Sequence, residues 1–393
     1  MDVPQRMTDP SGLGTLPAPP EPHAGVTEPG PQLSVIVPTF NERANVAEVV
    51  ERLRGTLAGR RWEVIFVDDD SPDGTGDAVR AIAAGDHRVR CLARLGRRGL
   101  ASACIEGMLA SSAPYLAVMD ADLQHDETLL PRMWDLMLES GADIVIGSRY
   151  AAGGGIGGWQ RSRATLSRYA TWLSRLVIRA QLTDPMSGFF MLRRPVLEEC
   201  VRGLSALGFK ILVDLFASAP RPLEFRELPY QFRPRRAGQS KLDSLVAWDF
   251  GLLLIDKLVG HIVPVRFIAF TLVGAFGFLV HFAVLAVLIG AFSQAFVRSQ
   301  AIATVVAMTF NYSVNNALTY RDRRLTGWGW LRGWAAFVAA CSVGAVANVG
   351  IASYVYHMRR AWVPAAAAGV LVGAVWNYAA TLVFTWSKPG GRT

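Results

Sequence analysis

The sequence predicts an α/β domain with a mainly parallel sheet, followed by a four-helix transmembrane domain. Up to about Arg235, short apolar runs alternate with segments of helical spacing, which indicates right-handed β-α-β units. From Val265 onward, four apolar spans each exceed the ~20 residues that are needed to cross a bilayer. A chain of 393 residues is too long for one ordinary domain, so each pattern is assigned its own domain.

The composition and charge indicate which kinds of molecule the protein is expected to bind. The net charge of +8 is basic, but the arginines cluster beside apolar stretches, which favours membrane lipids and phosphates over nucleic acid. The four cysteines show no C-x-x-C or metal-site spacing and are expected to stay reduced. Residues 1–32 are rich in Pro and Gly without an apolar run, which predicts a disordered tail rather than a signal peptide.

From residue 33 onward, the apolar pattern predicts five strands with four helices between them. The predicted strands are Leu33–Pro38, Trp62–Val67, Val89–Ala93, Tyr115–Met119 and Ile144–Gly147. The predicted helices are Asn45–Leu57, Asp77–Ala84, Leu100–Ala110 and Leu129–Glu139. Ligands of such sheets bind beyond the carboxyl ends of the strands, so polar motifs at those ends are expected to share one site.

The middle of the chain changes in character. Residues 151–158 are predicted to form a flexible Gly-rich loop, and residues 162–180 a helix with an apolar stripe flanked by arginines. Such a helix suits a membrane interface, and packing against the sheet is the alternative. A second helix of this kind is predicted over residues 243–260. The resulting domain boundaries are 33–242 for the α/β domain, 243–264 for an interfacial helix and 265–388 for the membrane domain.

The membrane domain shows signs of duplication. Its four spans are 265–290, 298–320, 333–356 and 362–386. Asn311-Tyr312 precedes Thr319-Tyr320, and Asn377-Tyr378 precedes Thr385-Trp386 at the same spacing, which predicts two repeated hairpins. The asparagines in the spans are expected to form interhelical hydrogen bonds rather than a conduction path.

The loops between the spans predict the orientation in the membrane. Four arginines, Arg321, Arg323, Arg324 and Arg332, lie between the second and third spans, whereas the other two loops carry only Arg298, and Arg359 with Arg360. The positive-inside rule therefore predicts a multi-pass cell-membrane protein with both termini and the α/β domain in the cytoplasm.

Two carboxylates, Asp120 and Asp122, directly follow the fourth predicted strand. Alternation along a strand puts both on one face, at the rim of the sheet. Mg²⁺ commonly binds one or two carboxylates together with phosphate oxygens, so a cation site is expected here. An acidic turn without such a role is the alternative for a D-x-D pattern standing alone.

Three further motifs indicate that the D-x-D pattern is part of a larger site. P-T-F-N-E ends the first strand at residues 38–42, and D-D-D-S-P-D-G-T ends the second at 68–75. Glu42 is expected to face a nucleoside hydroxyl or base, and Asp69 a base edge. R-R-A-G-Q-S-K at 235–241 supplies fixed positive charge for phosphates, and its glycine permits close approach of the backbone.

With G-S-R-Y at 147–150 and D-P-M-S-G-F-F at 184–190, these motifs resemble the dolichyl-phosphate mannosyltransferase group of the family-2 glycosyltransferases. The last four spans resemble the GtrA-like membrane domain. The resemblance implies a GT-A fold for nucleotide-sugar binding and transfer of a sugar from a nucleotide to a polyprenyl phosphate. It also implies donor contacts at Pro38, Phe40, Glu42, Val67, Asp69, Asp120, Ala121, Asp122, Gln124, Arg149, Arg235 and Lys241.

The resemblance further implies Mg²⁺ or Mn²⁺ bound by Asp120, Asp122 and Gln124. Three positions depart from the pattern of the family. They are Phe40 in place of Tyr, Asp70 in place of Gly and Ala101 in place of Gly.

The chemistry of the acceptor explains why the chain offers no recognisable catalytic base. A phosphate is already ionised at neutral pH and can attack the anomeric carbon in one inverting displacement. Arg149, Arg163 and Ser167 are suited to binding that phosphate through charge-assisted bonds, and with Asp122 they are the candidate catalytic residues. A basic face that meets anionic lipid is the alternative for the two arginines. His125 is expected to cap the turn rather than bind the metal.

Three hypotheses for function follow. The first is transfer of mannose from GDP-mannose to a polyprenyl phosphate at the cytoplasmic face of the membrane. The second keeps the fold and acceptor but takes UDP-glucose or another UDP-sugar as donor. The third makes the membrane half a translocator of lipid-linked sugars beside a vestigial transferase. The four spans are expected to anchor the protein in the membrane. The alternative is that they also form a homo-oligomer.

Overall fold

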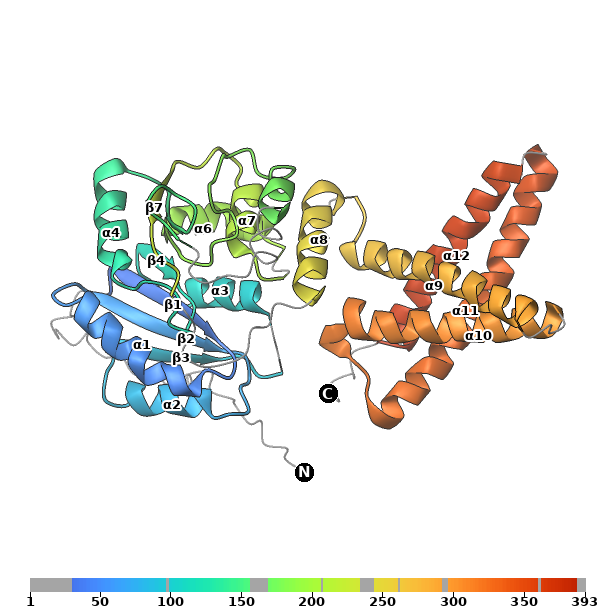
Figure 1. Cartoon of the computed structure of the whole chain (residues 1–393), viewed down its shortest axis with the longest axis horizontal. Helices are drawn as coiled ribbons and strands as arrows, with labels where there is room; N and C mark the ends of the chain where they lie inside the picture. The colour runs from blue at the N-terminus through green and yellow to red at the C-terminus, as the bar shows by residue number, and fades with distance from the viewer. Residues whose placement is uncertain are drawn as a thin grey trace, which may run out of the picture. The chain divides into compact units, whose positions relative to one another are not determined.

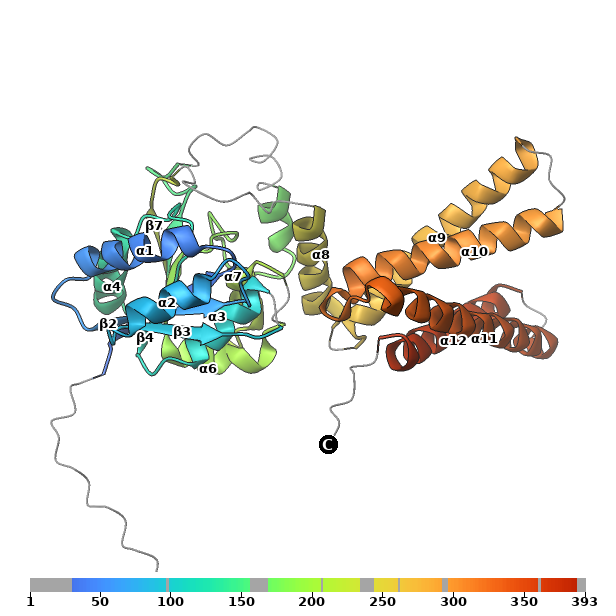
Figure 2. The same ribbon diagram turned by 90° about the horizontal axis from the view of Figure 1, so that it is seen from below.

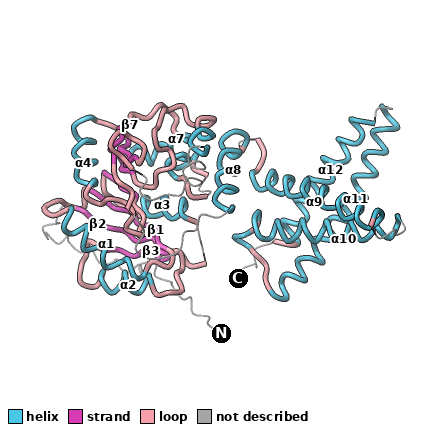
Figure 3. Tube along the Cα trace, in the orientation of Figure 1, coloured by secondary structure: helices cyan, strands magenta, loops and turns pink. Residues whose placement is uncertain are grey.

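The computed structural model describes residues 30–96, 99–155, 169–205, 208–233, 244–260, 262–291, 296–359 and 362–386. All strands in this part of the chain lie before residue 230, and from residue 244 on the described elements are helices (Figure 3). The predicted division into an α/β part and a helical part is therefore visible in the secondary structure.

One sheet of seven strands has the order β3-β2-β1-β4-β6-β5-β7. The strands are β1 Leu33–Thr39, β2 Trp62–Asp68, β3 Val89–Ala93, β4 Tyr115–Val118, β5 Ile144–Ser148, β6 Phe190–Arg193 and β7 Phe225–Pro229. Strands β1 to β4 are parallel, whereas β6 is antiparallel to both of its neighbours. The five predicted strands are present, but β6 and β7 were not predicted because both are short and β6 runs directly into a helix.

Helices cover both faces of the sheet (Figures 1 and 2). The first face carries α1 Arg43–Thr56, α2 Thr75–Ala83 and α4 Leu129–Ser140. The second face carries α3 Leu100–Leu109, α6 Arg194–Cys200, α7 Ile211–Ser218 and α8 Ser244–Val259. Within β1, Val35 and Val37 pack on the first face and Ile36 on the second. Burial on both sides explains why the central strands read as continuous apolar runs.

The predicted helix over residues 162–180 is wrong at its C-terminal end. In its described part the helix ends at Ser174, and a turn follows at residues 175–177. The turn brings Ile178 and Leu182 into the core beside α8, where both are buried. Tertiary burial of these two side chains therefore overrides the helical spacing. Tyr169 and Trp172, before the turn, remain exposed and stack on each other.

The helical part contains α9 Val265–Gly290, α10 Phe296–Val314, α11 Gly327–Arg359 and α12 Trp362–Phe384. A π-helical turn, Asn315–Thr319, extends α10. Helix α9 packs along α10, and α11 packs along α12 (Figure 2). Two described stretches, Val265–Gly290 and Gly327–Ala347, are long and apolar enough to cross a membrane, with mean hydropathies of 2.6 and 1.4.

The two hairpins make equivalent contacts. Asn311 lies against Gly277 in the first hairpin and Asn377 against Gly344 in the second. In both cases a Cβ added to the glycine would lie 2.0 Å from the amide oxygen of the asparagine. The rings of Tyr320 and Trp386, at matching positions in the two sequence repeats, stack with centroids 4.0 Å apart. The two hairpins thus share the same asparagine–glycine contact.

Candidate active site

The three acidic motifs follow three adjacent strands, β2, β1 and β4, at their carboxyl ends. In each motif one residue other than glycine has a left-handed backbone: Asn41 at φ 59°, Asp70 at φ 58° and Leu123 at φ 62°. Such a conformation costs about 1–3 kcal/mol and persists where the surroundings enforce it, most often at functional sites. The turns that carry the candidate residues are therefore held in defined directions.

Asp69 lies in a buried polar pocket at the end of β2. One carboxylate oxygen accepts a hydrogen bond from Arg94 Nη1 at 2.6 Å, and the other accepts from the Gly99 amide at 2.7 Å. Arg94 also donates to Ser102 Oγ, at 2.6 Å. Burial raises the pKa of Asp69, and the Gly99 amide and Arg94 oppose that rise. Asp69 is thus held in one orientation by Arg94 and the Gly99 amide.

Sequence reasoning did not single out Arg94. The signal was available, because Arg94 is the first residue after β3 and so belongs to the same row of strand ends as Asp69. Its side chain is 2% exposed, and it also lies 3.3 Å from the carboxylate of Glu106.

The first two motifs are bonded to each other around Asp73. Its carboxylate accepts hydrogen bonds from the hydroxyl and amide of Thr75 and from the amide of Arg43. The hydroxyl of Thr75 in turn accepts from the amide of Glu42, and the carboxylate of Glu42 accepts from Asn45 Nδ2 at 2.7 Å. Glu42, a predicted donor contact, therefore sits on a turn that the second motif supports.

The D-x-D turn presents a set of oxygen atoms. The side chain of Asp120 is 35% exposed, whereas Asp122 is buried and its Oδ1 accepts from the Gln124 amide at 3.1 Å. Gln124 Nε2 donates to the carbonyl of Arg233, at 3.1 Å, which turns Oε1 to the other side of the amide. Two carboxylates and one amide oxygen are ligands that a hard divalent cation accepts.

His125 caps this turn, as expected from the sequence. The Asp120 amide donates to His125 Nδ1 at 3.0 Å, so the proton of the neutral ring lies on Nε2. The ring stacks on Phe189 with centroids 5.1 Å apart, and Tyr230 and Phe232 contact it edge-on. A buried imidazole held in this way serves packing and turn geometry.

Among the residues that the structure describes, no group of three or more His, Cys, Asp or Glu side chains is placed to hold a metal. A site built from Asp120, Asp122 and Gln124 would therefore be incomplete without further oxygen atoms. Mg²⁺ usually binds in this way, through one or two carboxylates together with substrate phosphates and waters. The donor set thus fits a cation that binds together with a diphosphate.

Arg149 forms a buried ion pair that sequence reasoning did not foresee. Its Nε and Nη2 each donate to Asp184 at 2.7 Å, and its backbone amide donates to the same carboxylate at 3.1 Å. Burial alone would lower the pKa of Arg149, but Asp184 outweighs it and raises that pKa. The guanidinium also lies over the ring of Phe232, 5.6 Å from its centroid. Arg149 is predicted to bind the acceptor phosphate, and its guanidinium is already paired with the carboxylate of Asp184.

The other predicted contacts fall into two groups. Pro38 and Phe40 are half-buried at the end of β1, whereas Val67 and Ala121 are buried. Four predicted residues lie outside the described part of the chain: Arg163, Ser167, Arg235 and Lys241.

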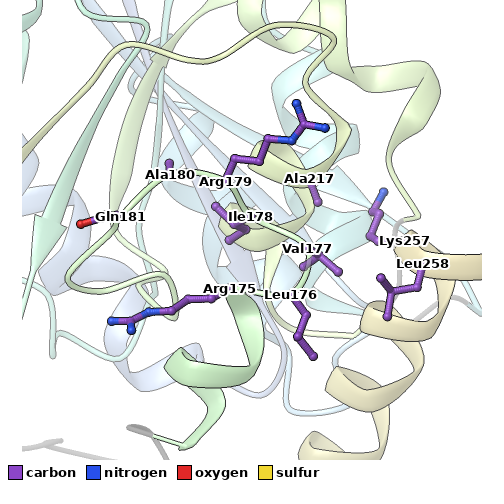
Figure 4. Close-up of a pocket in the computed structure, with 10 residues that line it drawn as sticks. All are labelled: Arg175, Leu176, Val177, Ile178, Arg179, Ala180, Gln181, Ala217, Lys257 and Leu258. Atoms are coloured by element: carbon purple, nitrogen blue, oxygen red, sulfur yellow. The ribbon is translucent and has the colours of Figure 1, made fainter.

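A groove of about 560 Å³ lies between residues 175–181 and the C-terminal end of α8 (Figure 4). Its lining combines cationic side chains such as Arg175 and Arg179 with apolar ones such as Leu176 and Leu258. The lining residue Lys257 is held by Asp214, with 2.6 Å between Nζ and Oδ1. The described residues that line this groove all lie outside the strand-end motifs.

Comparison with known proteins gives two family matches. Residues 34–201 match the profile of glycosyl transferase family 2, and residues 269–386 match the GtrA/DPMS transmembrane domain. Dolichol-phosphate mannosyltransferase of Pyrococcus furiosus is 35% identical over 254 residues, which cover 64% of this chain and 70% of that protein. The Saccharomyces cerevisiae protein of the same name is 37% identical over 224 residues, which cover 55% of this chain and 82% of that protein.

Glucosyl-3-phosphoglycerate synthase from Mycobacterium tuberculosis, in complex with Mn²⁺, uridine diphosphate and glucosyl-3-phosphoglycerate, is 18% identical with a TM-score of 0.43. The match covers 58% of this chain and 80% of that one.

Proposed function

Because the chain belongs to the dolichol-phosphate mannosyltransferases of glycosyltransferase family 2, we propose that it transfers mannose from GDP-mannose to a polyprenyl phosphate of the dolichyl type. The reaction takes place at the cytoplasmic face of the membrane in this proposal. The observation that carries it is the convergence of three acidic motifs at the ends of β2, β1 and β4.

The donor is assigned to that row of strand ends. Asp69, fixed by Arg94 and the Gly99 amide, accepts a hydrogen bond from the base. Asp120, Asp122 and Gln124 hold Mg²⁺ or Mn²⁺, which when bound offsets negative charge on the diphosphate. Arg235 and Lys241 add fixed positive charge for the same group.

The acceptor phosphate acts as the nucleophile. One of its oxygens forms a bond to the anomeric carbon while the bond from that carbon to the diphosphate breaks, and GDP leaves with the electron pair. The anomeric centre is inverted, and no proton has to be removed from the nucleophile at neutral pH. Arg149, Arg163 and Ser167 are proposed to hold the phosphate for this attack.

The membrane domain places the reaction at a bilayer. A polyprenyl phosphate keeps its headgroup at the membrane surface, so the active site has to face that surface. An interfacial surface combines apolar and cationic side chains. This combination is found around the groove, where Tyr169 and Trp172 are exposed and arginines of the segment 175–179 line the wall.

The test is sugar transfer by the full-length protein in membranes. We expect labelled mannose from GDP-mannose to appear on added polyprenyl phosphate, to be lost with a chelator and to return with Mg²⁺ or Mn²⁺. Asp122→Asn should lower the rate ~10²-fold or more. Asp135→Asn removes a partly exposed carboxylate on α4, outside the site, and should leave the rate unchanged. Turnover of UDP-glucose without turnover of GDP-mannose would replace the donor, and full activity of Asp122→Asn would refute the site.

A further inference from the structure

The segment from Asp120 to Glu127 contains four carboxylates within eight residues. Concentrated negative charge of this kind is unfavourable unless each group has a partner. The structure divides the four into two pairs. Asp120 and Asp122 line the strand-end site, whereas Asp126 and Glu127 are bound by Arg233.

Arg233 contacts Asp126, Glu127 and Gln124, and we call these four residues the Arg233 clamp. Its Nη1 lies 2.7 Å from Glu127 Oε2 and its Nη2 lies 2.7 Å from Asp126 Oδ1. Glu127 is 6% exposed and also accepts from Arg52 Nη1 at 3.2 Å. A buried carboxylate shared by two guanidinium groups is held in one place.

The backbone of Arg233 is bonded to the D-x-D turn as well. Its amide donates to the carbonyl of Gln124 at 3.0 Å, and its carbonyl accepts from Gln124 Nε2 at 3.1 Å. A carbonyl can accept only from the NH₂ side of a side-chain amide. Arg233 therefore determines which end of the Gln124 amide faces away, and that end is Oε1, the atom able to bind a cation.

The residues before Arg233 reinforce this attachment. Tyr230 and Phe232 contact the ring of His125, and the amide of Phe232 donates to the Gly155 carbonyl at 2.9 Å. The chain leaving β7 is thus attached to the D-x-D turn by aromatic packing, backbone bonds and two ion pairs. In sequence, Arg235 follows this attachment by only two residues.

We propose that Arg233 is a positioning residue, which orients the amide oxygen of Gln124 toward the cation. The proposal rests on the proposed function, since it assumes that the cation binds at Asp120 and Asp122. It predicts that loss of the clamp weakens cation binding even though Arg233 does not touch the cation. Partners of metal ligands typically contribute 10–100-fold to metal affinity.

The experiment compares Arg233→Gln with Arg221→Gln in the full-length protein. Arg221 is a matched control because it also binds two carboxylates, Asp143 at 2.6 Å and Glu199 at 3.1 Å, and it belongs to none of the motifs. Mn²⁺ binding is measured by electron paramagnetic resonance, with and without GDP, beside thermal unfolding. We expect a similar loss of thermal stability in both variants, but a Kd for Mn²⁺ that is about tenfold higher in Arg233→Gln alone.

One further variant, Arg233→Lys, completes the experiment. Arg233→Lys retains the charge but cannot reach both carboxylates at once, so its Kd for Mn²⁺ should lie between those of the wild type and Arg233→Gln. If Arg233→Gln does not fold, Arg233→Lys replaces it in the comparison with the wild type. Equal Mn²⁺ affinity in wild type, Arg233→Gln and Arg233→Lys would overturn the proposal. If the wild type binds Mn²⁺ but does not use GDP-mannose, the proposed donor fails while the clamp is still tested by the binding data.

Discussion

At the scale of single residues, the buried pair Arg149–Asp184 shows how the site is held together. Asp184 is fully buried and Arg149 is 9% exposed, so neither charge is solvated and each depends on the other. Buried ion pairs add little net stability compared with apolar residues, but removal of one partner leaves an uncompensated charge. The pair therefore fixes the guanidinium in one orientation beside Phe232 rather than contributing a large free energy of folding.

Asp184→Asn should lower the free energy of unfolding by about 3–5 kcal/mol, because it removes the carboxylate that is paired with the buried Arg149 guanidinium. Denaturant unfolding followed by tryptophan fluorescence measures this loss. Asp135→Asn is the control, since its carboxylate pairs with Arg60 at a partly exposed position and should contribute ~0–1 kcal/mol. Equal losses in the two variants would show that burial of the pair has no special weight.

At the scale of secondary-structure elements, the two helical hairpins α9–α10 and α11–α12 share one packing contact. An asparagine on the second helix fills the space over a glycine on the first, at Asn311 over Gly277 and at Asn377 over Gly344. Neither amide oxygen has a hydrogen-bond partner within the described residues. Close approach to a glycine backbone is a common way for apolar helices to associate, because lipid offers them no hydrophobic driving force.

Gly277→Ala and Gly344→Ala should each destabilise a hairpin by about 1–3 kcal/mol, because the new methyl group displaces the asparagine from its buried position. Gly274→Ala is a matched control on the same helix α9, where an added Cβ would meet no atom within 4 Å. Unfolding of the purified protein in detergent with increasing denaturant gives the comparison. A loss in Gly274→Ala as large as that in Gly277→Ala would contradict this account of the packing.

At the scale of the whole molecule, the charge distribution predicts the orientation in the membrane that the proposed reaction requires. The basic loop between the second and third spans carries Arg321, Arg323, Arg324 and Arg332, and the two other loops carry fewer cations. An excess of basic residues in short loops keeps those loops in the cytoplasm. A cytoplasmic active site is also where nucleotide sugars are available to a transferase of this kind.

Reporter fusions test this orientation. Green fluorescent protein fused after Thr393 should fluoresce in a bacterial host, and alkaline phosphatase at the same position should be inactive, because both report a cytoplasmic C-terminus. Alkaline phosphatase inserted into the loop after Ala291 should be active, since that loop is predicted to face outward. The opposite pattern at the two positions would place the transferase domain on the wrong side of the membrane for the proposed reaction.

The sequence by itself determined the alternation of strands and helices, the three motifs at strand ends and the change to apolar helices in the C-terminal part of the chain. These features depend on local periodicity, and parallel strands bring their carboxyl ends to one edge. It did not reveal β6, whose antiparallel place between β4 and β5 follows from pairing with distant strands.

Only the tertiary structure decided which charged groups are paired. Arg94 with Asp69, Arg149 with Asp184, and Arg233 with Asp126 and Glu127 are each far apart in sequence. No local pattern of residues encodes such a pairing, because it depends on which strand ends and loops the folded sheet brings together. The same reason explains the helix end at Ser174, where burial of Ile178 outweighed a helical spacing that continued past it.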